Sequence, residues 1–345
     1  MHESELQQRI SVAMRAAFPV KPFLGEAGLE PFYGMMQYHL GWMDEHFAPT
    51  AAKSGKLLRP LLVVLASRVF GGRDEQALPL AAGLQLLHDF SLLHDDIEDN
   101  SPTRRGRPTA WSIWGLAQGV NAGDGMFALA HRAIYSLSDV DVPPQRLIRI
   151  LHAFEETVLR ICEGQYLDIA AEGQMDVTEA RYSRMIRGKT AALAAASTGL
   201  GASISTDDEA QIAAMWEFGE ALGLTFQMQD DLLDIWGAPE TTGKPFAADL
   251  VQRKMSLPVI HGLAHASNED RRYFETLYRQ PELARADLET LMAILERTGA
   301  RTYVEHLAHA EYERAMTALD RVVPVVPKAL DQLRGLAQSL LGRAS

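Results

Sequence analysis

Cysteine is nearly absent from this sequence, because the 345 residues contain a single one, Cys162. One cysteine cannot form an intramolecular disulfide, and it excludes zinc sites that are built from several thiolates. We expect Cys162 to be a small core residue. The lack of disulfides is typical of a reducing compartment, so a cytoplasmic location is predicted.

Long apolar runs and an excess of positive charge are also missing. No stretch approaches the roughly 18 consecutive apolar residues of a membrane-spanning helix, so no transmembrane segment is predicted. The 45 Asp and Glu residues outnumber the 33 Lys and Arg residues, for a formal net charge of -12. A surface that follows nucleic-acid phosphates requires excess positive charge, so a nucleic-acid partner is excluded. A small anionic substrate requires only a local group of basic side chains.

Aromatic residues make up only 8% of the chain, whereas apolar residues of all kinds make up 47%. Ala and Leu, which favour helices, far outnumber the β-branched types that favour strands. Apolar residues recur at spacings of three and four, and Gly, Pro and small polar residues interrupt them near residues 71–74, 100–109, 142–144, 203–208 and 237–243. The sequence predicts an all-α fold in a single domain over residues 1–345.

Two short acidic segments share one pattern. Residues 95–99 read Asp-Asp-Ile-Glu-Asp and residues 230–234 read Asp-Asp-Leu-Leu-Asp, each at the end of an apolar helical segment. Asp95 and Asp99 are four residues apart, hence on one helical face, where like charges destabilise a helix by about 0.2–0.5 kcal/mol. One acidic run is commonly a solvated helix end, but two with the same spacing indicate bound cations. Oxygen ligands suit magnesium, which carboxylates usually hold together with substrate phosphates, so the pair predicts a diphosphate substrate.

Basic side chains accompany the acidic segments. They are Lys56, Arg59, Arg104, Arg105, Arg107, Lys189, Lys244 and Lys254. Each one alone is more often a surface charge, but arginine can bind phosphate oxygens in a bidentate manner. In an acidic chain, basic residues beside paired acidic motifs predict a site for two anions bridged by metal.

The order and spacing of these motifs resemble the trans-isoprenyl diphosphate synthases, the polyprenyl synthetase family. The motifs that carry the resemblance are Gly-Lys-Leu-Leu-Arg-Pro at 55–60, the acidic segment at 95–99 with Thr-Arg-Arg-Gly at 103–106, Glu-Gly-Gln at 163–165 with Asp168, Lys189-Thr190, Phe226-Gln227, the acidic segment at 230–234, Lys244, Asp249 and Lys254. The resemblance implies a bundle of long helices around a central apolar cavity, two facing aspartate clusters and a homodimer. It also implies a reaction in which isopentenyl diphosphate is joined head to tail to dimethylallyl, geranyl or farnesyl diphosphate.

The resemblance assigns roles to particular residues. The catalytic set is Asp95, Asp96, Asp99, Lys189, Thr190, Gln227 and Asp230. The ligands of three Mg²⁺ ions are Asp95, Asp99, Asp230, Asp231, Asp234 and Asp249. Arg104, Lys189 and Lys244 hold the allylic diphosphate, whereas Lys56, Arg59, His88 and Arg105 hold isopentenyl diphosphate. The oxygen dipoles of Thr190 and Gln227 are expected to stabilise the carbocation.

Phe90 is the predicted determinant of product length. It precedes Asp95 by five residues, roughly 7.5 Å along a helix, on the path of a growing chain. By the resemblance, an aromatic residue here, beside the small Ser91, is typical of enzymes that make geranylgeranyl diphosphate. Farnesyl and geranylfarnesyl diphosphate are the alternative products.

Two other functions compete with this interpretation. A class I terpene cyclase also uses an aspartate-rich helix and magnesium, but its second metal motif normally combines Asn or Asp, Ser or Thr, and Glu. A non-catalytic partner subunit tends to lose one aspartate cluster, whereas this chain keeps both. Both observations favour the prenyltransferase.

Overall fold

The computed structural model describes residues 3–25, 27–50, 57–238, 246–280 and 282–341. The chain forms two compact units. The first unit comprises Met1–Phe154, Ser197–Ile212 and Pro324–Ala329, and the second comprises Glu155–Ala196, Ala213–Val323 and Leu330–Ser345.

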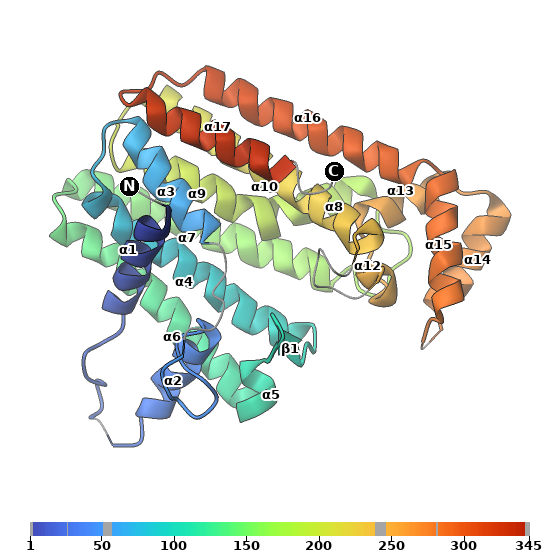
Figure 1. The fold of residues 1–345 in the computed structure, drawn as a ribbon, viewed down its shortest axis with the longest axis horizontal. Helices are drawn as coiled ribbons and strands as arrows, with labels where there is room; N and C mark the ends of the chain where they lie inside the picture. Colours follow the sequence, from blue (N-terminus) through green and yellow to red (C-terminus); the bar gives the residue numbers. More distant parts are fainter. Residues whose placement is uncertain (1–2, 26, 51–56, 239–245, 281, 342–345) are drawn as a thin grey trace. The chain divides into compact units, whose positions relative to one another are not determined.

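Helices make up most of the first unit (Figure 1). They are α1 (Glu3–Ala16), α2 (Glu30–His39), α3 (Leu58–Val69), α4 (Asp74–Glu98), α5 (Ala110–Trp114), α6 (Leu116–Tyr135) and the 3₁₀ turn η1 (Ser136–Asp139). A two-residue antiparallel hairpin, β1 (Thr103–Arg104) and β2 (Arg107–Pro108), follows α4. Its tight turn has positive φ at both Arg105 and Gly106, as hairpins of this length require. The sequence did not predict this hairpin.

The second unit is also helical in its described part. Its own elements are α8 (Glu179–Ile186), the π-helical segment η2 (Arg187–Ala191), α12 (Ala248–Val251), α13 (Leu257–His265), α14 (Asn268–Tyr278), α15 (Arg285–Arg297) and α16 (Ala300–Asp320). Four further helices contribute residues to both units: α7 (Pro144–Ile169), α9 (Ala192–Ser203), α10 (Glu209–Trp236) and α17 (Pro327–Leu341). The all-α prediction is confirmed, and the helices end at the predicted interruptions.

Helix α4 is the centre of the first unit, where it packs against α1, α3 and α6. Leu80, Leu84 and Leu87, at spacings of four and three, are completely or almost completely buried. Burial of each leucine contributes roughly 1.5–3 kcal/mol. At Gly83 a Cβ atom would lie 2.4 Å from Cγ1 of Ile134. Any larger residue at this position would therefore separate α4 from α6.

The ends of α4 follow from its terminal residues. Asp74 and Glu75 lie in its first turn, where negative charge is favourable to the helix dipole. Arg68 donates to both carboxylate oxygens of Asp74 at 2.7 Å. At the other end, Asn100 adopts a left-handed conformation with φ of 49°, which stops the helix after Glu98.

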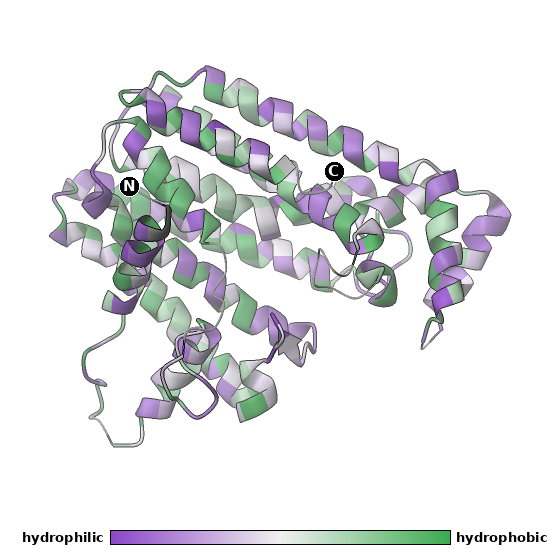
Figure 2. Ribbon diagram, in the orientation of Figure 1, coloured by the Kyte–Doolittle hydropathy of each residue, from purple (hydrophilic) through white to green (hydrophobic). Residues whose placement is uncertain are grey.

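The core of the second unit joins α8, α10, α13 and α16. It contains Tyr182, Ile186, Leu224, Leu232 and Val304, all buried. Figure 2 shows hydrophilic and hydrophobic residues mixed along α16, as expected for a helix with one buried side. A second cluster around Phe274 and Leu291 packs α14 and α15 with α13.

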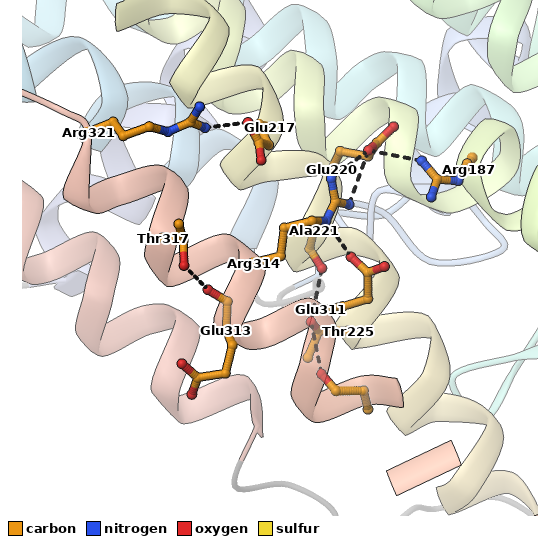
Figure 3. A network of polar contacts seen from close by, with 11 residues as sticks. Arg187, Glu217, Glu220, Ala221, Thr225, Glu311, Glu313, Arg314, Thr317 and Arg321 are labelled. Atoms are coloured by element: carbon orange, nitrogen blue, oxygen red, sulfur yellow. Dashed lines mark hydrogen bonds and ion pairs between the residues drawn. The ribbon is translucent and has the colours of Figure 1, made fainter. Parts of the chain in front are cut away.

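Polar contacts also connect these helices (Figure 3). On α16, Arg314 donates to Glu220 of α10 at 3.1 Å and to Glu311 at 2.8 Å. Arg187, the first residue of η2, donates to the same oxygen of Glu220 at 3.1 Å. Single exposed ion pairs contribute little, about 0–1 kcal/mol. This one shares a carboxylate between two arginines, so it links η2, α10 and α16.

One prediction about the core is wrong. Cys162 is exposed on α7, near the exposed apolar side chains of Leu159, Tyr166 and Ile169. These residues recur at spacings of three and four, which is the pattern of a buried helical face. The periodicity identified an apolar face but could not show whether this chain covers it.

Within the described residues, no helix combines the length and the apolar character that a lipid bilayer would require of a span.

Candidate active site

The first aspartate cluster lies in the last turns of α4. Asp95 and Asp96 belong to the helix and Asp99 follows its last residue. The carbonyl end of a helix carries partial negative charge, and the last turn of α4 contains no basic residue. Mutual repulsion and the helix dipole both disfavour these carboxylates. The position therefore favours a bound cation.

Asp96 is the buried member of this cluster, with 1% of its surface exposed. Its Oδ1 accepts a hydrogen bond from Nε of Arg104 at 2.7 Å. Its Oδ2 is buried and has no hydrogen-bond partner among the described residues. Burial raises the pKa of Asp96 to about 6, against the opposing effect of Arg104. Arg104 of β1, predicted to hold the allylic diphosphate, is thus paired with Asp96 of α4.

The residues predicted to bind isopentenyl diphosphate lie around α3 and α4. Nη1 of Arg59 lies 3.3 Å from Nε2 of His88. Burial and the neighbouring Arg59 keep the pKa of His88 well below its usual value, so the imidazole is neutral and accepts the hydrogen bond. Arg105 is exposed at the hairpin turn. Lys56, the fourth predicted residue, lies outside the described residues.

Of the two predicted chain-length residues, Phe90 packs against α6. Phe90 is half-buried, and its ring centroid lies 4.9 Å from that of Phe127 and 4.8 Å from that of His94. The Phe127 ring in turn contacts His131 at 4.5 Å. The hydroxyl of Ser91 donates to the backbone oxygen of His88 at 2.8 Å. The Phe90 ring is thus supported by further rings.

The second aspartate cluster lies in the last turns of α10. Asp231 is 4% exposed and accepts hydrogen bonds from three groups. These are the hydroxyl of Tyr182 at 2.5 Å, Nε2 of Gln227 at 2.9 Å and the backbone N–H of Leu257 at 3.0 Å. Burial raises the pKa of Asp231, and these hydrogen bonds oppose the rise. Asp230 and Asp234 lie on the same helix end, which also lacks basic residues in its last turn.

Asp249 joins the second cluster from α12. It is 4% exposed, and its pKa is raised by burial and then by the charges of Asp231 and Asp234. Ala247, the residue before α12, has a left-handed conformation with φ of 50°. Lys254 is exposed, and its charge opposes the rise of the Asp249 pKa. Three carboxylates thus affect one another electrostatically in this unit.

The π-helical segment η2 presents Lys189 and Thr190. The hydroxyl of Thr190 donates to Oε1 of Gln227 at 2.7 Å, and Nζ of Lys189 donates to Oδ2 of Asp168 at 2.6 Å. A π turn inserts one extra residue into the helical repeat and is frequent at functional sites. The structure therefore brings the predicted Thr190 and Gln227 together. Lys244 lies outside the described residues.

Two glycines allow α7 to approach η2. A Cβ atom on Gly164 would lie 2.1 Å from the backbone nitrogen of Lys189. A Cβ atom on Gly188 would lie 2.6 Å from the backbone oxygen of Arg160 and 2.8 Å from Cα of Gly164. No side chain can occupy that space, so glycine is required on both sides of this contact.

Sequence reasoning missed three side chains that support these groups. Tyr182 donates to Asp231 from 49 residues away, and no sequence signal indicates that contact. Asp168 was part of a recognised motif but had no assigned partner. Asp89 accepts from Gln85 at 2.9 Å; the four-residue spacing of these polar residues on an apolar helix was a signal available from the sequence.

The donor set suits a hard divalent cation. Carboxylate oxygens dominate both clusters, as magnesium prefers. In the described part of the chain, no three side chains of Asp, Glu, His or Cys already converge on one metal position. That is compatible with magnesium, which usually takes one or two carboxylates and completes its coordination with water and substrate phosphates. The Oδ2 of Asp96, which has no hydrogen-bond partner in the described part of the chain, is one oxygen that a cation or its water would satisfy.

Comparison with known proteins identifies the family. The sequence model of the polyprenyl synthetases matches residues 41–295. The chain belongs to the polyprenyl synthetase family. It is 39% identical over 299 residues to the geranylgeranyl diphosphate synthase of Mycobacterium tuberculosis, covering 86% of this chain and 84% of that protein. It is 37% identical over 313 residues to the (2E,6E)-farnesyl diphosphate synthase of the same species, covering 90% of this chain and 85% of that protein.

Solved structures of this family share the fold. The geranylgeranyl pyrophosphate synthase of Corynebacterium glutamicum, complexed with isoprenyl diphosphate and magnesium, superposes with a TM-score of 0.84. It is 26% identical, covering 99% of this chain and 98% of that chain. The polyprenyl synthetase described here is thus a trans-prenyltransferase that elongates an allylic diphosphate with isopentenyl diphosphate.

Proposed function

We propose that this polyprenyl synthetase makes geranylgeranyl diphosphate in a magnesium-dependent reaction. The observation that carries the product length is the ring of Phe90, one and a half turns before Asp95 and packed on Phe127 at 4.9 Å. A ring supported by a second ring resists displacement by a growing chain. The similarity to a geranylgeranyl diphosphate synthase adds support, while the similar farnesyl diphosphate synthase supports the shorter alternative.

Magnesium would be held by the carboxylates of the two clusters. The proposed ligands are Asp95, Asp99, Asp230, Asp231, Asp234 and Asp249, with Asp96 in support. Three ions per site are proposed, as the family resemblance implies. When bound, the metal would neutralise the allylic diphosphate and stabilise it as a leaving group. Magnesium in the similar Corynebacterium glutamicum structure supports this choice of metal.

The chain's own side chains would bind and orient the two substrates. Arg59, His88 and Arg105, with Lys56, would hold isopentenyl diphosphate. The neutral His88 accepts from Arg59, which directs the guanidinium. Fixing the double bond near the reacting carbon converts an encounter of two molecules into an effectively unimolecular step.

The allylic substrate would be held by Arg104 and Lys189, with Lys244. Both described residues already contact carboxylates, Asp96 at 2.7 Å and Asp168 at 2.6 Å, which keeps their side chains oriented. Loss of the diphosphate leaves an allylic cation. The oxygen atoms of Thr190 and Gln227, linked at 2.7 Å, would stabilise that cation by their dipoles.

Product analysis tests this function. The purified protein is incubated with magnesium, isopentenyl diphosphate and, in turn, dimethylallyl, geranyl and farnesyl diphosphate, and products are identified by mass spectrometry. Geranylgeranyl diphosphate from every starter is the expected result. A cyclic hydrocarbon without elongation would indicate a terpene cyclase, and no product would indicate a non-catalytic subunit.

Phe90→Ala tests the chain-length assignment. Removing the ring opens space beside Phe127, so products longer than those of the wild type are expected. Phe23→Ala is a matched control, because Phe23 is an aromatic residue with 76% of its surface exposed. An unchanged product profile in Phe90→Ala would refute the assignment.

We also propose that the chain works as a homodimer. The exposed Leu159, Tyr166 and Ile169 form an apolar face on α7, and exposed apolar faces of this kind are typical of protein interfaces. Tyr166→Glu should shift the protein to monomers in analytical ultracentrifugation. The single-domain organisation over residues 1–345 and the cytoplasmic location stay predictions.

A further inference from the structure

Asp89 is a buried carboxylate on α4 that the proposed reaction does not use. It lies between His88 and Phe90 and is only 3% exposed. Nε2 of Gln85 donates to its Oδ2 at 2.9 Å, and Nε2 of His39 lies 3.7 Å from its Oδ1. A buried carboxylate is costly unless positive charge compensates it, so the question is which groups supply that charge.

The titratable and charged groups near Asp89 belong to four elements. These are His39 of α2, Arg59 of α3, His88 of α4, and Arg104 and Arg105 of the hairpin. Helix α1 contributes only uncharged side chains, Gln7, Gln8, Ser11 and Met14, to a cavity of about 250 Å³ that Asp89 and Arg105 also line.

The two histidines do not provide the compensating charge. Burial and the nearby arginines lower the pKa of His39 to about 3, and burial and Arg59 keep the pKa of His88 far below neutrality. Both rings are therefore uncharged at pH 7. The positive charge around Asp89 comes from the arginines.

Asp89 and the arginines stabilise each other's charged forms. Burial raises the pKa of Asp89 to about 6, while the Gln85 hydrogen bond and the charges of Arg105, Arg59 and Arg104 lower it. Conversely, burial lowers the pKa of Arg59 to about 10, and the charge of Asp89 is the leading effect that raises it. Nε of Arg59 is also buried without a hydrogen-bond partner in the described structure.

An anion bound to Arg59 and Arg105 would change this balance. A diphosphate that pairs with the two guanidinium groups cancels their field at Asp89 and adds negative charge near a buried carboxylate. The ionised form of Asp89 then loses its compensation. Since the carboxylate is close to titrating before the ligand arrives, protonation is the route with the lowest cost.

We propose that Asp89 is the counter-charge of the isopentenyl diphosphate site, ionised when that site is empty and protonated when the diphosphate pairs with Arg59 and Arg105. The proton comes from solvent and binds a carboxylate oxygen, and no bond of the substrate changes. This inference rests on the proposed assignment of Arg59, His88 and Arg105 to isopentenyl diphosphate. Asp89 is a positioning residue, since it acts through the two arginines.

The sign of the pH dependence follows from linkage. Binding raises the pKa of Asp89 above about 6, so the complex holds more protons than the free protein. Affinity for isopentenyl diphosphate should then fall as pH rises from about 6 toward 8. If binding raises the pKa by one unit, the fall is about fivefold between pH 6 and pH 8, and tenfold is its upper limit.

Calorimetric titration tests the proposal. Isopentenyl diphosphate is added without magnesium and without an allylic partner, so that no condensation occurs, at pH values from 5.5 to 8 in two buffers of different ionisation enthalpy. The wild type should take up protons and lose about sevenfold in affinity over this range if its pKa rises by one unit. Asp89→Asn resembles the protonated form of Asp89. Once the ionisation of isopentenyl diphosphate itself is subtracted, this variant should bind it equally tightly at pH 5.5 and at pH 8.

Controls separate charge from structure. Asp141→Asn makes the same chemical change at an exposed carboxylate that pairs with Arg73, and its titration should match the wild type. Asp89→Ser removes the charge by a second route if Asp89→Asn does not fold. Equal weakening of binding at every pH in the Asp89 variants would overturn the proposal in favour of a purely structural role. Retention of the wild-type pH dependence and proton uptake in them would overturn it too.

The proposed function fails in a distinguishable way. A wild-type protein that does not bind isopentenyl diphosphate at any pH, or that makes no elongated product, contradicts the site assignment itself. A wild type that binds and elongates, but without proton uptake beyond that of the Asp89 variants, contradicts only the role of Asp89.

Discussion

The two aspartate clusters have the same spacing and the same place at a helix end, yet their surroundings differ. In the first unit, Asp96 receives one charged hydrogen bond, from Arg104 at 2.7 Å, and its second oxygen has no partner among the described residues. In the second unit, Asp231 receives three hydrogen bonds from uncharged donors. One motif is therefore embedded in two kinds of environment.

The difference indicates a division between an adaptable cluster and a preset one. The guanidinium of Arg104 can release Asp96 and bind a phosphate instead, because guanidinium groups bind both carboxylates and phosphates. The donors of Asp231 are a phenol, an amide and a backbone N–H, and the last of these cannot rotate away. We therefore expect the first cluster to rearrange with its ligands and the second to keep its geometry.

Removal of magnesium should have the largest effect, and it should affect both clusters alike. Chelation with EDTA is expected to abolish product formation, because neutralisation of the leaving diphosphate is lost, and added magnesium should restore it. The helical circular dichroism should stay unchanged. Full activity in EDTA would contradict a metal role for either cluster.

Loss of one aspartate from either cluster should come next. Asp95→Ala and Asp230→Ala should each lower the rate at saturating substrate by about a thousandfold, as losses of charge-stabilising groups do. Incorporation of labelled isopentenyl diphosphate measures this. The exposed Asp139 and Asp176 serve as matched Ala controls that should retain activity. A strong effect in only one cluster would show that the shared spacing does not mean a shared role.

Gly188→Ala should affect the second unit through its backbone. The added methyl would lie 2.6 Å from the backbone oxygen of Arg160, and overpacking of this kind costs about 1–3 kcal/mol. Gly335→Ala on α17 is the matched control, since nothing lies within 4 Å of the added methyl, and it should stabilise the helix slightly. Urea unfolding distinguishes the two; equal stabilities would mean that η2 can move away from α7.

The smallest expected effect is the difference in stability cost between the two buried aspartates. Asp231→Asn places an amide N–H₂ among donors and should cost about 2–3 kcal/mol, whereas Asp96→Asn, with one charged partner, should cost about 1 kcal/mol. Thermal and urea unfolding measure both. In a double-mutant cycle, Tyr182→Phe should cost less in the Asp231→Asn background than alone. A larger loss for Asp96→Asn would reverse the distinction between the clusters.

Helix periodicity predicted where several helices begin and end, and the motifs predicted which side chains belong to the site. The interruption at residues 71–74 separates α3 from α4, and the one at 203–208 separates α9 from α10. Thr190 and Gln227, paired by resemblance alone, do share a hydrogen bond. The prediction that Cys162 is a core residue was wrong, because Cys162 is exposed. The same apolar spacing occurs on a helical face that the chain itself covers and on a face that the chain leaves exposed.

The sequence by itself determined the helices and the placement of each aspartate cluster at the end of a helix. Both are local properties, decided by a repeat of 3.6 residues and by the side chains that end a helix. Only the tertiary structure decided that Tyr182 supports Asp231, that His39 and His88 are uncharged, and that Asp89 lies among arginines. The reason is that hydrogen bonds and pKa values depend on burial and on charges from segments far apart in the chain, which no local pattern records.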